Sequence, residues 1–369
     1  MGMIRVALAV AVLLSHLPMA EFKFLSGGLA VQSFFIISGF YMSLVLSTKY
    51  ADIGMFYSNR ALRLYPGYIA MLALGGFTLL ALDASATATP ALISSILQDP
   101  VSSAVMAFEN IAIVGQELLF WFTIDGQGAL HLDPTGVVPS EQVSVAWQGL
   151  MAPQSWSLSM ELMFYAIAPF LVRLRWHWLV ALTLASIGVR LAGHWLPVDY
   201  LLWQGRFFPT ALFMFLLGML GHRCLPLVER APRAVGWVMA AALLAYIVGN
   251  SLLPLEPMAA RWLTYAVVAC ATPWVFHAFK SVSFDRWIGE LSYPVYLSQL
   301  IVIGVVLKCE PPFPMWTAIF ATFAISAAVM VLIERPIDHW RQRRLQRVIS
   351  RPPAGAPSPT AHSPSSVSS

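Results

Sequence analysis

Long apolar segments, separated by short polar or proline-containing breaks, dominate the chain. About 20 apolar residues are enough to cross the hydrocarbon core of a membrane as a helix, and windows near that length recur along the sequence. We expect each window to form a spanning helix. The ten windows are 4–20, 29–47, 64–82, 156–172, 178–193, 207–222, 234–253, 262–279, 287–307 and 315–333.

Composition supports the same fold class. Of the 369 residues, 58% are hydrophobic and only 11% are charged, whereas about 25% of a typical soluble domain is charged. The pattern predicts an all-α polytopic membrane protein with about ten transmembrane helices.

The distribution of Lys and Arg predicts the orientation, because cytoplasmic loops are enriched in positive charge. With a cytoplasmic N-terminus, 17 of the 22 Lys and Arg residues lie inside, and the segment 83–155 contains none. We expect both termini in the cytoplasm, in a bacterial inner (cytoplasmic) membrane. The five basic residues that then lie outside are Lys23, Arg190, Arg206, Arg261 and Lys308.

Segment 104–124 is apolar but contains Glu109, Asn110, Gln116 and Glu117. One more crossing there would reverse every later loop and put the arginine clusters outside. We therefore predict an extra re-entrant or interfacial helix within a long external loop.

The two ends of the chain differ in character. Residues 1–20 resemble a signal peptide, but Pro18 stands where a cleavage site needs a small residue, so we expect this first helix to be retained. We divide the chain into a membrane domain, 1–336, and a tail, 337–369, that is first basic and then rich in Pro and Ser. The tail is predicted to be a disordered cytoplasmic extension.

Several classes of function are excluded or disfavoured. The net charge of +4 is spread over short loops, so nucleic acid is not an expected partner. The three cysteines, Cys224, Cys270 and Cys309, lack the spacing of a disulfide framework or a zinc site, and no metal is expected. A phosphate-binding loop ending in Gly-Lys-Ser/Thr is missing from the sequence.

Chemistry must then come from polar residues near or within the apolar windows. His16 lies inside the first window, where an ionisable side chain is costly and usually faces the protein interior. A neutral imidazole there can accept the proton of an attacking hydroxyl group. The alternative is a histidine that is hydrogen-bonded near a helix end for structural reasons.

Three further sets of residues are candidates. Arg60 and Arg63 project from one face of a helical turn at the cytoplasmic boundary, as phosphate ligands or as topology anchors. Glu161 lies about 8 Å below the start of its window, where it either supports His16 or is tied up by packing. Ser38 and Gly39 allow close approach of another helix or of a narrow acyl or pantetheine arm.

Taken together, these segments resemble the acyltransferase-3 family of membrane-bound O-acyltransferases. The resemblance runs from Ile4 to about Pro336. It rests on Arg5 with His16, Gly28 to Phe40, Arg60-x-x-Arg63-x-x-Pro66, Trp156-Ser157-Leu158-x-x-Glu161-x-x-Phe164-Tyr165, Ile288-Gly289-x-x-Ser292-Tyr293-x-x-Tyr296-Leu297, and Glu334-x-Pro336. Two departures from the family pattern are Gln32, where relatives often have Asp, and Gln299, where they often have His.

The resemblance implies that acyl-CoA, as a co-substrate entering from the cytoplasm, donates an acyl group to a carbohydrate or surface polysaccharide. It implies that His16 is catalytic, that Arg60 and Arg63 lie near the donor, and that acetyl-CoA is the expected donor. Two alternatives stay open: a proton-coupled transporter or flippase, and an acyl relay to a partner enzyme. Membrane lipid surrounds the chain, and a homodimer or glycan-assembly partners also stay open.

Overall fold

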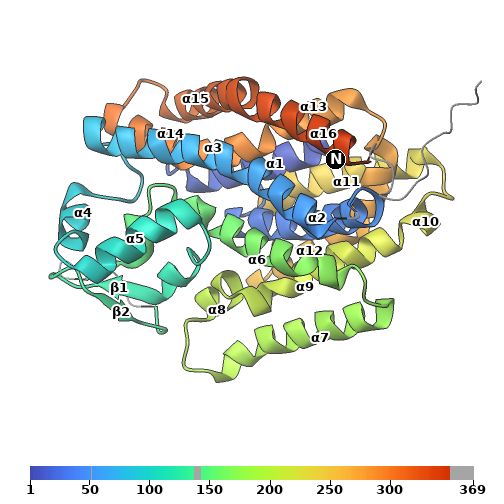
Figure 1. Ribbon diagram of the computed structural model, residues 1–369, viewed down its shortest axis with the longest axis horizontal. Helices are drawn as coiled ribbons and strands as arrows, with labels where there is room; N and C mark the ends of the chain where they lie inside the picture. The colour runs from blue at the N-terminus through green and yellow to red at the C-terminus, as the bar shows by residue number, and fades with distance from the viewer. Residues whose placement is uncertain (51, 137–142, 350–369) are drawn as a thin grey trace, which may run out of the picture.

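The structure is a computed structural model that describes residues 1–50, 52–136 and 143–349. Its longer helices run broadly along one axis and form a bundle (Figure 1). The α-helices are α1 (Gly2–His16), α2 (Gly27–Thr48), α3 (Ile53–Leu82), α4 (Pro90–Ile96), α5 (Pro100–Ala112), α6 (Trp156–Leu171), α7 (Trp176–Ala192), α8 (Tyr200–Arg206), α9 (Phe208–Arg223), α10 (Leu225–Val228), α11 (Arg233–Gly249), α12 (Pro257–Phe279), α13 (Ser283–Glu290), α14 (Ser292–Cys309), α15 (Pro314–Val329) and α16 (Arg335–Ile349).

Short elements make up the rest of the secondary structure. Three strands form a small antiparallel sheet in the order β2-β1-β3. The strands and 3₁₀ turns are β1 (Phe122–Ile124), β2 (Leu130–Leu132), β3 (Ser144–Val145), η1 (Leu118–Trp121), η2 (Ala146–Gly149), η3 (Pro153–Ser155), η4 (Gly193–Trp195) and η5 (Asn250–Leu252). A π-helical turn, η6 (Met330–Glu334), joins α15 to α16.

The prediction of an all-α polytopic membrane protein is confirmed. Each of the ten apolar windows falls on a helix. Within the described residues, seven helices are long and apolar enough to span a membrane, and two bent helix pairs raise that number to nine. Large apolar side chains such as Leu80, Val238 and Phe320 point outward and are at least 66% exposed, as expected for surfaces that contact lipid.

Helices α2 and α9 cross at unusually close range. A Cβ atom on Gly39 would lie 1.9 Å from the carbonyl oxygen of Phe215, and one on Gly218 would lie 1.9 Å from that of Ile36. Small residues permit this approach of two backbones within a membrane. Gly39, which the sequence suggested as part of a donor site, is therefore a helix-packing residue.

The two ends of the bundle carry different elements. At one end, which we call the N-terminal face, the Asp285 carboxylate of α13 accepts hydrogen bonds from the backbone N–H groups of Gly2 and Met3. Glu290 of α13 pairs with Arg335 of α16 at 3.5 Å, so α1, α13 and α16 meet there. His16 ends α1 at the other end, the opposite face.

Helices α4 and α5, with the small sheet, cover part of that opposite end (Figure 1). The two helices turn back on each other by 117°, as in a broken or re-entrant span. Polar residues of segment 104–124 point into the protein: Gln116 donates to the Tyr68 hydroxyl and accepts from Ser155. This arrangement supports the prediction that 104–124 is a re-entrant element rather than a complete crossing.

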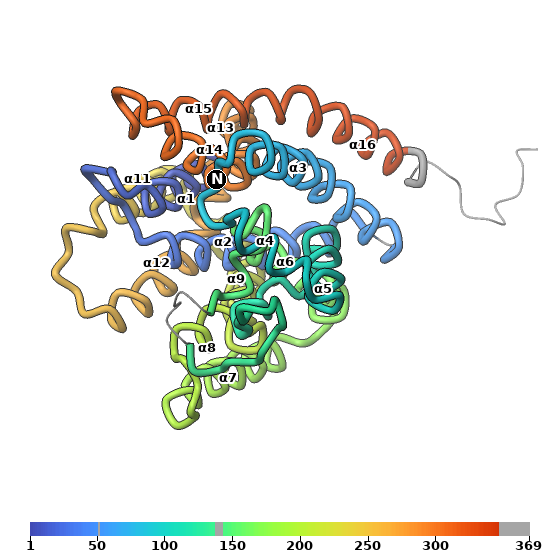
Figure 2. The backbone as a smooth tube through the Cα atoms, turned by 90° about the vertical axis from the view of Figure 1, so that its left-hand side faces the viewer, coloured from blue at the N-terminus to red at the C-terminus, as the bar shows by residue number. Residues whose placement is uncertain are grey.

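The basic part of the predicted tail is helical. Residues 335–349 form α16, which follows α15 at one edge of the bundle, opposite α7 and α8 (Figure 2). Arg341 donates to the Asn59 carbonyl of α3, which holds the helix against α3, and it also pairs with Asp338 one turn earlier on α16. The Pro- and Ser-rich part of the tail, for which we predict disorder, lies outside the described residues.

We predict that the N-terminal face is cytoplasmic. Cysteine introduced at the exposed Gln127, in a variant lacking the three native cysteines, should react with a membrane-impermeant thiol reagent from outside intact cells. Cysteine at the exposed Gln346 should react only after the membrane is permeabilised. The reason is the bias of Lys and Arg toward the N-terminal face, and the reverse labelling pattern would overturn the assigned orientation.

Candidate functional site

A cavity of about 410 Å³ opens in the N-terminal half of the bundle. Its walls come from α1, α2, α3, α6 and α14, and its mouth is lined by α13 and α16. Along α2 the lining runs from Val31 to Val45, which corresponds to about 21 Å of helix. The cavity is therefore elongated along the bundle axis and suits a long, narrow ligand.

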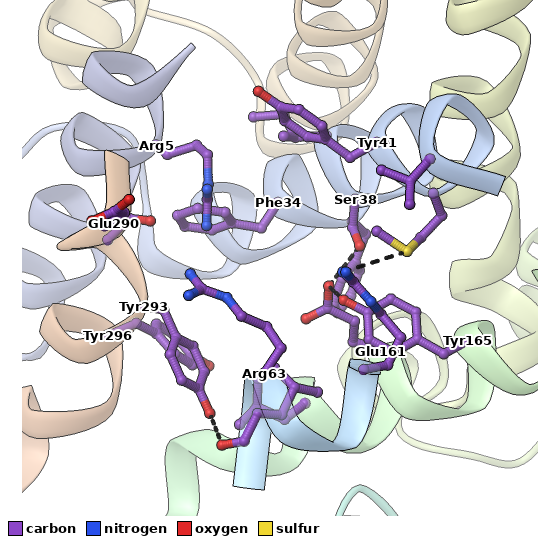
Figure 3. Close-up of a pocket in the computed structure, with 18 of the residues that line it drawn as sticks. Arg5, Phe34, Ser38, Tyr41, Arg63, Glu161, Tyr165, Glu290, Tyr293 and Tyr296 are labelled. Atoms are coloured by element: carbon purple, nitrogen blue, oxygen red, sulfur yellow. Dashed lines mark hydrogen bonds between the residues drawn. The ribbon is translucent and has the colours of Figure 1, made fainter. Parts of the chain in front are cut away.

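Arginine side chains dominate the electrostatics of this cavity. Arg5 of α1 and Arg63 of α3 point into it from different elements (Figure 3), and Arg60 lines it one helical turn before Arg63. Within the described chain, neither Arg5 nor Arg60 has a carboxylate within 4.0 Å. Cations held this way are suited to phosphate oxygens.

Arg60 and Arg63 differ in how they are held. The Arg60 guanidinium lies 5.9 Å and 5.8 Å from the ring centres of Phe56 and Tyr165, and its Nε has no hydrogen-bond partner among the described residues. Arg63 lies 3.5 Å from the Glu334 carboxylate, which η6 presents, and is also over the Tyr293 ring. One Arg60 N–H makes a weak 4.0 Å contact with the Met42 sulfur, and the other donors of its guanidinium are available to a ligand, whereas Arg63 already neutralises a buried acid.

We predict different outcomes for the two arginines. Arg60→Ala should weaken acyl-CoA binding with little change in thermal stability, and Arg60→Lys should restore binding only in part because Lys lacks the planar fork. Arg63→Ala should weaken binding and also lower the melting temperature, since it leaves Glu334 buried without its cation. Calorimetric binding and thermal unfolding of the purified protein measure both effects.

The Glu334→Gln substitution is the matched control. Added to Arg63→Ala, it should recover most of the lost stability but none of the lost binding, because it removes the uncompensated charge and not the missing guanidinium. If both arginine variants bind acyl-CoA normally, the two residues only anchor the topology.

Glu161 lies on the wall of the same cavity. Its carboxylate accepts hydrogen bonds from the Ser38 hydroxyl at 2.6 Å and from the Tyr165 hydroxyl one turn later on α6 (Figure 3). These bonds fix one carboxylate oxygen and join α2 to α6. The side chains of Ser38, Glu161 and Tyr165 therefore form one polar cluster on the cavity wall.

The inner end of the cavity is lined by Phe35, Ser157 and Tyr296. The Ser157 and Tyr296 hydroxyls lie 2.7 Å apart, and Tyr296 also donates to the Gln154 carbonyl. Tyr293, on the same face of α14, donates to the Leu64 carbonyl at 2.6 Å and braces α3. These hydrogen bonds hold the inner wall rigidly between α3, α6 and α14.

Beyond that wall, Arg206 is held between two aromatic rings. Its guanidinium carbon lies 3.4 Å from the ring centre of Trp156 and 4.1 Å from that of Phe120. Trp156 also contacts Phe35 of the cavity edge-on, with ring centres 6.3 Å apart. The Phe120 and Trp156 rings are nearly perpendicular to each other, at 74°, so the guanidinium can lie flat on only one of them. In the described part of the chain, no carboxylate lies within 4.0 Å of Arg206, so the cation is held by aromatic contacts rather than by an ion pair.

His16 lies exposed at the end of α1, on the opposite face. Its Nδ1 is 3.0 Å from the Val12 carbonyl oxygen. Because a carbonyl can only accept, Nδ1 carries the proton and Nε2 of the neutral ring keeps a lone pair. Among the described residues no hydrogen bond or ion pair joins His16 to a charged side chain, and the positive charge of Arg206 acts on it only through space. His16 therefore belongs with the Arg206 region.

The geometry groups the predicted residues into two places. Arg5, Ser38, Arg60, Arg63 and Glu161 share the cavity with Ser157, Tyr165 and Tyr293, whereas His16 and Trp156 lie with Arg206 beyond its inner end. Glu161 bonds to Ser38 and Tyr165 rather than to the imidazole, so the suggested direct support of His16 by Glu161 is absent from the described contacts.

Comparison with known proteins decides the class. A family model described as an acyltransferase domain matches residues 2–335. The chain belongs to the acyltransferase-3 family. Neither a curated protein nor a solved structure gives a match. The protein is thus a membrane acyltransferase, and its family match covers the His16 region and the cavity except for the lining residues of α16.

Sequence reasoning missed two residues of this acyltransferase site. Arg206 had been counted only as one of five basic residues on the outer side, although its place in Gln-Gly-Arg-Phe-Phe, on an otherwise apolar stretch, was a usable signal. Tyr296 was quoted only as part of a motif. Their roles depend on rings and hydroxyls that come from distant segments, α6 and η1, and one sequence does not reveal such pairings.

Proposed function

We propose that this acyltransferase moves an acyl group, in the simplest case acetyl, from cytoplasmic acyl-CoA to a hydroxyl group of a carbohydrate or surface polysaccharide. The observation that carries the proposal is the elongated cavity with the unpaired arginines Arg5 and Arg60, whose inner end adjoins the Trp156 and Arg206 pair through Phe35. In this arrangement donor and acceptor reach the reaction centre from opposite faces.

The donor would lie along α2. The arginines would bind the negatively charged phosphates of CoA, while Glu161, fixed by Ser38 and Tyr165, accepts hydrogen bonds from the amide N–H groups of the pantetheine arm. The thioester would then lie at the inner wall near Ser157 and Tyr296. This order matches the cavity, which has its cations toward the mouth and α3 and its neutral hydroxyls at the inner end.

His16 would act as the general base. Its Nε2 accepts the proton of the acceptor hydroxyl while the oxygen attacks the thioester carbonyl carbon. The C–S bond of the resulting tetrahedral intermediate breaks, and the imidazolium returns the proton to the CoA thiolate. The products are an O-acyl ester and free CoA, so no further reactant is needed.

Arg206 would stabilise the oxygen of the same intermediate. Negative charge develops on the acyl carbonyl oxygen, and donors that are already fixed in a low-dielectric site stabilise that charge without reorganising. The aromatic clamp formed by Phe120 and Trp156 contacts the guanidinium from two directions and supplies such preorganisation.

Mass spectrometry of surface glycans and secreted metabolites, with and without the gene, tests the proposal. An acyl mass increment that disappears on deletion identifies the acyl group and the class of acceptor together. Calorimetry with acetyl-CoA and the purified protein tests the donor. Acetyl-CoA binding without acceptor acylation by the purified protein would indicate an acyl relay to a partner, and glycan translocation without acyl-CoA binding would indicate a transporter.

A further inference from the structure

The cavity mouth contains an arginine that no acid neutralises. Arg286 of α13 lines the mouth and is exposed. α13 also carries two acids: Glu290, one turn later on the same face and so placed to neutralise Arg286, and Asp285, directly before it in the sequence. Whether Arg286 can bind a ligand therefore depends on where these two acids point.

Both acids of α13 are engaged elsewhere. Asp285 is 4% exposed, and its carboxylate accepts from the Gly2 and Met3 backbone N–H groups at the start of α1. Glu290 pairs with Arg335 of α16 at 3.5 Å. In the described residues no carboxylate lies within 4.0 Å of Arg286. The fold thus directs the neighbouring negative charge away and leaves a free guanidinium at the mouth.

Arg341 is the second arginine at the mouth, and it is held differently. It pairs with Asp338 and donates to the Asn59 carbonyl at 3.2 Å, so its donors serve to dock α16 on α3. Arg286 is therefore the mouth arginine whose hydrogen-bonding capacity is available to a ligand.

From this geometry we infer that Arg286 binds the 3′-phosphate of the CoA ribose and makes the enzyme select CoA thioesters over their 3′-dephospho forms. The inference rests on the proposed function, because it places the nucleotide end of the donor at the mouth and the thioester at the inner wall. The 3′-phosphate belongs to the nucleotide end of CoA, farthest from the thioester. An unpaired guanidinium at the mouth suits it in charge and in bidentate geometry.

Calorimetric titration of the detergent-purified full chain with CoA and with 3′-dephospho-CoA tests the inference. The parent should bind CoA at least about 10-fold more tightly, the range expected for one hydrogen bond to a charged group. Arg286→Ala should bind CoA as weakly as 3′-dephospho-CoA and should bind 3′-dephospho-CoA like the parent. The unchanged binding of 3′-dephospho-CoA shows in the same experiment that the variant is folded.

Arg343→Ala is the matched control. Arg343 is an exposed arginine of α16 that does not line the cavity, so its loss changes the net charge equally. The preference for CoA should survive in this variant, and in the parent it should shrink as salt is raised because the mouth is solvent-exposed.

Three results would overturn the inference. Equal binding of both ligands by the parent would leave the donor site intact but without a 3′-phosphate subsite. An equal loss of preference in both arginine variants would assign the effect to bulk charge. Failure of the parent to bind either ligand would reject acyl-CoA as donor, and the proposed function and this inference would fall together.

Discussion

Replacing His16 with alanine should reduce acyl transfer about 100- to 10,000-fold, the usual cost of losing a general base, while leaving acyl-CoA binding intact. The binding cavity is built from other residues, and His16 lies beyond its inner end on the opposite face. The measurements are acylation of the acceptor and calorimetric binding of acetyl-CoA. His131→Ala, which removes an exposed histidine paired with Asp125 in the small sheet, is the control and should transfer normally.

The pH dependence gives a second readout of the same role. Transfer should fall as the solution is acidified through the titration of the imidazole, which is near pH 6.5 when unperturbed, because protonated Nε2 cannot accept a proton. Binding of acetyl-CoA should not follow that profile. Near-parental turnover by folded His16→Ala protein would remove His16 from the chemistry.

The helices were predictable because membrane spans depend on a local property. Within each window nearly every residue is apolar, whatever its neighbours in space, and the structure has a helix at each of the ten windows. The re-entrant element was predicted from a different signal, the charge distribution of loops far from it. The end of α1 was predicted less well: the helix stops at His16, where Leu17 adopts an extended conformation before Pro18.

The candidate site was only partly predictable, since a sequence gives residue types and depth but not partners. The type and spacing of Arg60 and Arg63 predicted that both bind phosphate. The sequence did not show that Arg63 forms an ion pair with Glu334, about 270 positions later, whereas Arg60 does not. Similar depths suggested that Glu161 would support His16, but Ser38 and Tyr165 hold that carboxylate in the cavity. Depth along the membrane normal does not specify the position around the bundle.

Replacing Arg206 with alanine should lower the rate of transfer about 100- to 1,000-fold, the range measured when one preorganised donor to an oxyanion is removed. The loss should appear in kcat, with acyl-CoA affinity unchanged, because Arg206 lies beyond the cavity wall formed by Phe35 and Trp156. Arg206→Lys should recover only part of the rate, since an ammonium group lacks the planar face that the guanidinium places 3.4 Å from the Trp156 ring centre.

The control for Arg206 is Lys23→Ala, which removes an exposed positive charge that we also assign to the outer side and should leave transfer unchanged. Steady-state kinetics with the acceptor identified by mass spectrometry then separate three outcomes. A loss confined to kcat supports oxyanion stabilisation. A loss confined to the KM of the acceptor would assign Arg206 to acceptor binding. Parental kinetics in folded Arg206→Ala protein would show that the positive charge of Arg206 does not contribute to the reaction. The aromatic clamp would then have only a structural role.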